Sequence, residues 1–257
     1  MWNLHHKKIL ITGGTKGIGR ASVIETLKLG AEVLFTARGK TEVASFEQQL
    51  LDQGLPATGL AGDMANGEHR QDIFNWINDR WGALDVLVNN AGMNIRKPTL
   101  EFAVQEYQNI LDVNLIAPFE LSRSLHPLLV QGKHSVIVNI ASVAGFLDVQ
   151  TGSPYAMSKA ALIQQTKSLA AEWAKDGIRV NALSPWFTET PLTEALLLNE
   201  AKVQDVLSRT PLQRVARPEE MAFIIAFLAM DQSSYITGQN IIADGGMSAT
   251  ALFTPVK

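Results

Sequence analysis

Seven short runs of apolar and β-branched residues recur along the chain, and each has the length and composition of a buried strand. The runs are Lys8–Thr12, Glu32–Thr36, Thr58–Ala61, Asp85–Asn89, Ser135–Ala141, Arg179–Leu183 and Gln239–Ala243. Stretches with helical character lie between them, namely Ile18–Leu29, Glu68–Trp81, Val104–Leu129, Tyr155–Lys175 and Pro218–Ala229. This alternation predicts an α/β fold, a doubly wound, Rossmann-type parallel sheet of about seven strands with helices on both faces.

One segment departs from the alternation. Residues 190–209 add a helical stretch, Leu192–Leu207, between the sixth and seventh strands. Insertions at the carboxyl end of a parallel sheet lie where ligands bind, so we expect a lid over a substrate. No linker or internal repeat divides the chain, and we expect residues 1–257 to form a single domain.

Charge and composition narrow the range of partners. The net charge is -3 and no basic stripe is present, which disfavours nucleic acid and anionic membranes. The absence of cysteine excludes disulfides, thiolate chemistry and cysteine-ligated metals, and the five histidines show no metal-ligand spacing, so no metal is expected. We find no signal peptide and no membrane span, and we expect a cytoplasmic protein whose partners are small molecules or its own copies.

A glycine-rich turn joins the first strand to the first helix. It comprises Thr12–Gly19, and its glycines permit a tight turn and close approach of the backbone to a pyrophosphate at the helix N-terminus. The alternative is a purely structural turn, but the strand-turn-helix context favours a dinucleotide, and the spacing does not fit an NTPase loop. The candidate contacts are Gly13, Thr15, Lys16, Gly17, Ile18 and Gly19.

The end of the second strand bears on which dinucleotide binds. No acidic residue stands there to accept from a ribose 2′-hydroxyl, whereas Arg38 offers a planar fork suited to a 2′-phosphate. Lys16 adds a second positive charge, so we expect NADP(H) to be preferred over NAD(H). The alternative is two solvated surface cations. Further candidates at the next strand ends are Asp63, Met64, Asn90, Ala91 and Gly92. The alternative for the asparagines Asn89 and Asn90 is that they are structural caps.

The candidate chemistry centres on Tyr155 and Lys159, which are four residues apart at the head of a helix and share one face. A phenol has an ordinary pKa of about 10, so proton transfer near neutral pH needs a fall of about 3, and a nearby ammonium acts in that direction. Ser142, just past the fifth strand, is placed to bind the same oxygen. The pair alone also fits a solvated surface, but together with Ser142 and the glycine turn it predicts catalysis.

These motifs together resemble the short-chain dehydrogenase/reductase family over nearly the whole chain. They are Thr12–Gly19, Asn89–Gly92, Asn114 in Asp112–Asn114, Ser142, Tyr155 with Lys159, and Asn181–Pro185. Within the family, the segments Ser168–Asp176, Ser234–Gln239 and Asp244–Gly246 are similar to the tropinone-reductase-like members.

The resemblance implies an NADP(H)-dependent oxidoreductase that moves a hydride between nicotinamide and a small ketone or secondary alcohol. Tyr155 would transfer the proton, Ser142 would polarise the carbonyl, Lys159 would lower the Tyr155 pKa and bind the ribose, and Asn114 would keep a relaying water. The remaining cofactor candidates are Pro185, Thr188 and Thr190. One departure stands at Trp186, where the family usually has glycine after the proline.

Other substrates and one other class remain open. A 3-oxoacyl-thioester reductase or a sugar or steroid dehydrogenase would use the same catalytic residues, and Asp148 is a candidate contact for a cationic substrate. A catalytically silent dinucleotide-binding sensor is the alternative outside enzymes. The apolar helices Val104–Leu129 and Tyr155–Lys175, with Ala251–Phe253, predict a homodimer or homotetramer, unless these faces only cover the sheet.

Overall fold

A computed structural model describes residues 2–250, and they form a parallel seven-stranded sheet. The strands are β1 Lys8–Thr12, β2 Glu32–Ala37, β3 Thr58–Ala61, β4 Val86–Asn89, β5 Val136–Ile140, β6 Arg179–Pro185 and β7 Asn240–Ala243. Their order across the sheet is β3-β2-β1-β4-β5-β6-β7. The predicted doubly wound fold is confirmed, and the order reverses between β1 and β4, the switch point at which such sheets bind ligands.

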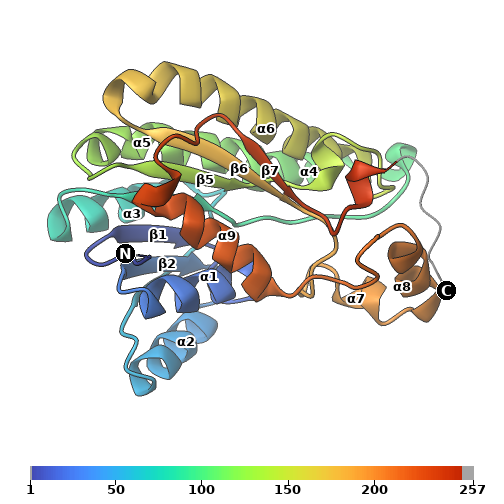
Figure 1. Cartoon of the computed structure of the whole chain (residues 1–257), viewed down its shortest axis with the longest axis horizontal. Helices are drawn as coiled ribbons and strands as arrows, with labels where there is room; N and C mark the ends of the chain where they lie inside the picture. Colours follow the sequence, from blue (N-terminus) through green and yellow to red (C-terminus); the bar gives the residue numbers. More distant parts are fainter. Residues whose placement is uncertain (1, 251–257) are drawn as a thin grey trace.

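Helices cover both faces of the sheet, as Figure 1 shows. They are α1 Gly17–Lys28, α2 Lys40–Asp52, α3 Gly67–Arg80, α4 Val104–Leu111, α5 Ala117–Val130, α6 Ser153–Trp173, α7 Glu194–Leu197, α8 Glu200–Ser208 and α9 Pro218–Ala229. The sequence analysis did not single out α2. None of the helices within residues 2–250 has the length and apolar character that crossing a membrane requires.

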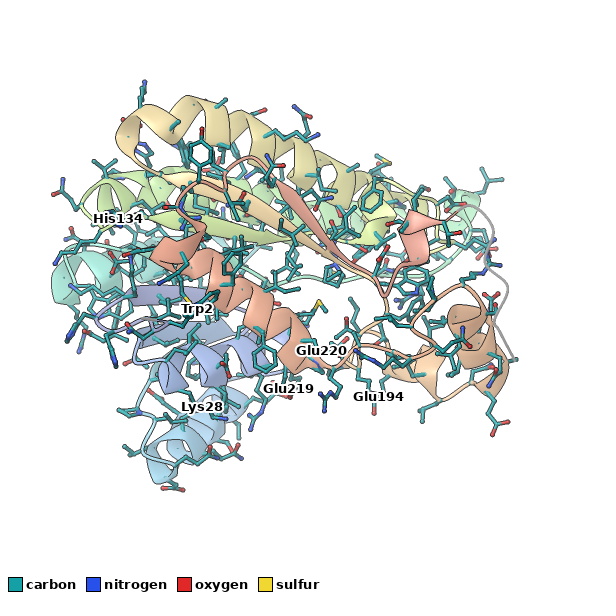
Figure 2. The ribbon with its side chains drawn as sticks, viewed as in Figure 1. Trp2, Lys28, His134, Glu194, Glu219 and Glu220 are labelled. Atoms are coloured by element: carbon teal, nitrogen blue, oxygen red, sulfur yellow. The ribbon has the colours of Figure 1, made fainter. Side chains whose placement is uncertain are left out.

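Alternate side chains of each central strand enter two separate cores. In β1, Ile9 and Ile11 pack with residues of α1, α2 and α9, whereas Leu10 packs with residues of α3, α5 and α6. All three side chains are fully buried, because side chains alternate between the faces of a strand and both faces are covered. At the edge of the first core, Trp2 stacks on Phe227 of α9 with ring centroids 5.8 Å apart (Figure 2).

The stretch predicted as one helix over Val104–Leu129 is interrupted. A π-helical turn, Asp112–Ile116, separates α4 from α5, and the first turn of α5 contains a proline. Pro118 has no N–H to donate to the carbonyl four residues earlier, which is that of Asn114. The turn therefore widens at Asn114 and leaves that carbonyl without its α-helical partner.

The helix predicted over Leu192–Leu207 is also divided. It forms α7 and α8, because Asn199 adopts an extended conformation between them and accepts a hydrogen bond from the Lys202 amide as the N-cap of α8. Both short helices lie beyond the carboxyl ends of the strands (Figure 1), and Glu194 marks the start of α7 in Figure 2.

Candidate active site

A cleft of about 910 Å³ opens at the carboxyl edge of the sheet. Parallel strands all end at this edge, so loops that are distant in sequence meet there. Of the predicted residues, the cleft is lined by Gly13, Thr15, Lys16, Gly17, Ile18, Arg38, Asp63, Met64, Asn90, Ala91, Gly92, Ser142, Tyr155, Lys159, Pro185, Thr188 and Thr190. Gly19 and Asn114 are not in the lining. Within residues 2–250, no cluster of acidic or histidine side chains is arranged to hold a metal ion.

The glycine turn between β1 and α1 has the shape that a dinucleotide pyrophosphate needs. Gly13 and Gly17 have φ values of +67° and +51°, which a residue with a side chain rarely adopts. A Cβ added to Gly19 would lie 2.2 Å from the Gly13 carbonyl oxygen, so Gly19 permits the turn instead of contacting the cleft. An anion bound at this turn would meet the amides at the start of α1, so the turn fits a pyrophosphate.

The end of β2 places positive charge at the same end of the cleft. Arg38 is exposed, lines the cleft and has no partner among residues 2–250. Lys16 Nζ lies 2.7 Å from Glu42 Oε1 in an exposed ion pair. The site therefore holds one guanidinium without a partner in the described chain, that of Arg38, and one ammonium, that of Lys16, which is paired with the Glu42 carboxylate.

Two predicted contacts also have structural roles. Asn90 Nδ2 donates to the carbonyls of Thr12 and Gly13, at 2.8 and 3.1 Å, and so fastens the loop after β4 to the glycine turn. Asp63 Oδ1 accepts from the Ala65 amide at 2.9 Å and closes the turn after β3. Asn90 and Asp63 therefore cap the turns after their strands as well as line the cleft.

Tyr155 lies in the wall of the cleft near the start of α6, and Lys159 Nζ is 5.6 Å from the centroid of its ring. Burial raises the pKa of the Tyr155 phenol, while a hydrogen bond with Ser142 and the positive charge of Arg96 act to lower it. The expectation that Lys159 lowers this pKa is not met. Desolvation is the larger effect on the phenol, and the cation that opposes it is Arg96.

Lys159 is almost completely buried, with 4% of its surface exposed. Its Nζ donates to the Ile140 carbonyl at 2.8 Å, at the end of β5. Desolvation lowers the pKa of this ammonium from 10.5 to about 8. Lys159 is therefore able to exchange a proton close to neutral pH.

Asn114 is fully buried behind the cleft. Its Oδ1 accepts from the Met93 amide and its Nδ2 donates to the Met93 carbonyl, both at 2.9 Å, and Nδ2 also lies 3.2 Å from Ser158 Oγ. A Cβ on Gly92 would approach both Asn114 Oδ1 and Lys159 Nζ, at 3.4 and 3.7 Å. The Asn114 side chain thus fixes the loop after β4 against α6, beside Lys159.

Trp186, where the family usually has glycine, ties the strand end to the 190–209 segment. Its indole Nε1 donates to Thr210 Oγ1 at 3.1 Å, and its ring meets Phe187 edge-on. At the other end of the segment, Thr193 Oγ1 donates to the Thr188 carbonyl at 2.5 Å, and a Cβ on Gly17 would lie 2.9 Å from Thr190 Cγ2. Both ends of the segment are therefore anchored at the cleft.

Among the cleft residues that the sequence analysis did not single out are two charged side chains, Arg96 and Glu42. Arg96 follows β4 in an irregular loop and Glu42 lies in the first turn of α2. A lone arginine in a loop and a glutamate on an exposed helix carry no periodic signal, so nothing in the sequence distinguished them from solvated surface charges.

Comparisons with known proteins agree with this site. Residues 13–248 match the family model described as enoyl-(acyl carrier protein) reductase. A tropinone reductase homolog of Arabidopsis thaliana is 42% identical over 257 residues, covering 100% of this chain and 97% of that protein. A tropinone reductase homolog of Datura stramonium is 37% identical over 249 residues, covering 95% and 93%.

Solved structures with the same fold include enzymes of this chemistry. A gluconate 5-dehydrogenase from Burkholderia cenocepacia, in complex with NADP and tartrate, superposes with a TM-score of 0.92 at 30% identity, covering 97% of this chain and 98% of that one. A short-chain type dehydrogenase/reductase from Mycobacterium marinum gives 0.90 at 30% identity, with the same coverage.

The fold and the site define an NAD(P)-dependent oxidoreductase that interconverts an alcohol and a ketone. The chain belongs to the short-chain dehydrogenase/reductase family and is tropinone-reductase-like within it. It binds a nicotinamide dinucleotide and acts on a small molecule.

The buried Lys159 generates a prediction about stability. Its pKa is about 8 in the fold against 10.5 when solvated, so the unfolded chain binds more protons between these pH values and stability rises with pH across that window. Lys159→Met removes the charge. We expect the free energy of unfolding of the variant to exceed that of wild type by up to about 3 kcal/mol below pH 8, and this excess to fade toward pH 10.5.

Urea unfolding of both proteins across this window measures the difference. The hydrogen bond lost at the Ile140 carbonyl offsets the gain by an amount independent of pH, so the slope of the difference is the readout. A difference that stays flat with pH would show that Lys159 is not desolvated.

Proposed function

We propose that the protein is an NADP(H)-dependent reductase of small ketones in which Tyr155 protonates the carbonyl oxygen. One observation above all supports this function: the glycine turn and the group of Tyr155, Ser142 and Lys159 line the same cleft. The nicotinamide, when bound, supplies a hydride to the carbonyl carbon and is left oxidised. The carbonyl oxygen takes up one proton from the protein, so that the ketone becomes an alcohol.

Different residues of the cleft donate the proton, orient the carbonyl and resupply the proton donor. A neutral phenol is the form that acts as an acid, and burial keeps the pKa of Tyr155 high enough to hold it in that form. Ser142 donates a hydrogen bond to the same carbonyl oxygen and orients it. Lys159, with a pKa of about 8, binds the ribose and returns a proton to Tyr155. Asn114 holds the relaying water at its backbone carbonyl, to which Pro118 has no N–H to donate.

The charges at the end of β2 support a preference for NADP(H). Arg38 presents a guanidinium without a partner in the described chain, and its fork suits the 2′-phosphate. Lys16 can leave Glu42 and pair with the same phosphate, because an exposed ion pair contributes little free energy and is easily broken.

The whole chain acts as one catalytic domain in this proposal, with residues 190–209 as the substrate lid. Anchors at both ends support this role, since Thr193 bonds to Thr188 at the start and Trp186 bonds to Thr210 at the end. At the position where the family usually has glycine, the Trp186 side chain therefore holds the end of the lid through its hydrogen bond to Thr210.

We also propose self-association into a homodimer or homotetramer. Large apolar side chains are exposed on the outer helices, among them Ile116 at the end of the π-helical turn, Phe119 in the first turn of α5 and Met157 on α6. Ala251–Phe253, the third predicted contributor, lies outside the described residues. A cytoplasmic location stays a prediction of the sequence.

Replacing Tyr155 with phenylalanine tests the proposed function. Tyr155→Phe removes the proton donor and preserves the ring, so ketone reduction should fall by about 10²–10⁴-fold while NADPH binding is unchanged. NADPH absorbance measures turnover, and NADPH fluorescence measures binding. Tyr235→Phe is the matched control, because Tyr235 is fully exposed. A wild-type protein that binds NADPH yet turns over no compound in a broad ketone and alcohol panel would support the sensor instead.

Replacing Arg38 tests the cofactor preference. Arg38→Asp exchanges the phosphate-binding fork for a carboxylate, so kcat/KM for NADPH should fall by about 10- to 100-fold while that for NADH is kept or rises. Lys40→Gln, a cation two residues away that is outside the cleft, should leave the ratio unchanged. An equal loss with both cofactors would contradict a role for Arg38 in reading the 2′-phosphate.

A further inference from the structure

Arg96 stands in the wall of the cleft on a loop whose neighbouring residues are anchored. Asn94 Nδ2 donates to the carbonyl and to the hydroxyl of Thr151, at 3.1 and 2.7 Å, and Lys97 pairs with Glu106. A Cβ added to Gly152 would lie 3.1 Å from the Ile95 carbonyl oxygen, so the two loops approach closely. The backbone on both sides of Arg96 is therefore held in place, while its own side chain enters the cleft.

The Arg96 guanidinium has no acidic partner among residues 2–250. Nη1 donates to the Leu192 carbonyl at 3.1 Å, which occupies one of the five N–H donors of the group. Arg96 is exposed to solvent, and partial burial lowers the pKa of its guanidinium, but an arginine keeps its proton in a protein. A cation in a cleft, with open donors and no acidic partner, is a site for an anion.

This cation lies at the reacting end of the cleft. The positive charge of Arg96 acts to lower the pKa of the Tyr155 phenol, and Tyr155 in turn acts to raise the pKa of Arg96. Asp148, an acidic residue of the lining, forms no ion pair with Arg96; it is exposed, and its Oδ1 accepts from the Gln150 amide at 3.0 Å. The position proposed for the carbonyl is therefore flanked by a positive group that the protein itself does not neutralise.

We propose that the natural substrate is an oxo acid, or the corresponding hydroxy acid, whose carboxylate pairs with the Arg96 guanidinium. This inference rests on the proposed function, and it names the substrate class. The planar fork of arginine binds a carboxylate through two parallel hydrogen bonds and would fix the distance between the anion and the carbonyl at Tyr155. A cationic amine substrate, by contrast, meets an uncompensated positive charge at this point.

The same side chain joins the substrate to the proposed lid. The Nη1 bond to Leu192 places Arg96 against residues 190–209, while its other donors are open to the cleft. Pairing with a carboxylate neutralises the guanidinium and so favours its burial under a closed lid. Neutral ketones lack this contribution and should bind less tightly.

The test compares acids with their own esters. The substrates are straight-chain oxo acids in which the carbonyl moves stepwise away from the carboxylate, each with its methyl ester, and the readout is kcat/KM from NADPH absorbance. We expect wild type to prefer the acid by about 10- to 100-fold for at least one chain length. Arg96→Gln should abolish this preference, because kcat/KM falls by about 10- to 100-fold more for the acid than for the ester, and Arg96→Lys should keep part of it. Arg80→Gln, which removes an exposed arginine at the end of α3, is the matched control.

Two results would overturn the inference. One is a wild-type enzyme that reduces ester and acid equally at every chain length. The other is an Arg96→Gln variant in which kcat/KM falls by the same factor for acid and ester, because Arg96 would then act only through Tyr155 and not on the substrate.

A direct binding measurement separates this inference from the proposed function. If wild type reduces none of the ketones, the proposed function fails, and calorimetric titration of the corresponding hydroxy acids still tests Arg96. Binding to wild type that weakens by about tenfold or more in Arg96→Gln supports the anion site. Absent binding, or equal binding to both proteins, rejects it.

Discussion

Burial of two titratable groups, Tyr155 and Lys159, is the constraint on which the site depends. Both project from the first turns of α6 toward the end of β5, where Ile140 offers a carbonyl to the lysine. Desolvation favours the neutral form of each group, so it raises the pKa of the phenol and lowers the pKa of the ammonium to about 8. The two pKa values are thereby moved apart, so the Lys159 ammonium becomes the stronger acid and is suited to return a proton to the Tyr155 phenolate.

The parallel sheet makes this arrangement possible. Its strands all end at one edge, so the glycine turn after β1, the loop after β4 and Ser142 after β5 meet in one cleft although they are distant in sequence. The contacts that join these loops are mostly hydrogen bonds to backbone groups, such as those of Asn90 to the glycine turn and of Asn114 to Met93. The scaffold therefore positions the reacting groups with little help from exposed ion pairs.

Features that follow from local patterns were visible in the sequence, and features made by distant contacts were not. The strands and most helices could be predicted because burial on both faces imposes short apolar runs, and the spacing of Tyr155 and Lys159 is a local property. The bond from Trp186 to Thr210 and the charge of Arg96 on Tyr155 join residues far apart in the chain, so no local pattern reveals them. Pro118 is a local signal for an interrupted helix, because proline has no N–H to donate. The π-helical form of the interruption at Asn114 could not be predicted from it.

The ionisation of Tyr155 tests the controlling role of burial most directly. The chain contains 3 tyrosines, so the difference in phenolate absorbance between wild type and Tyr155→Phe during an alkaline titration isolates this one phenol. The account predicts a Tyr155 pKa above the ordinary value of about 10. A pKa well below 10 would contradict it, since the neighbouring cations would then outweigh desolvation.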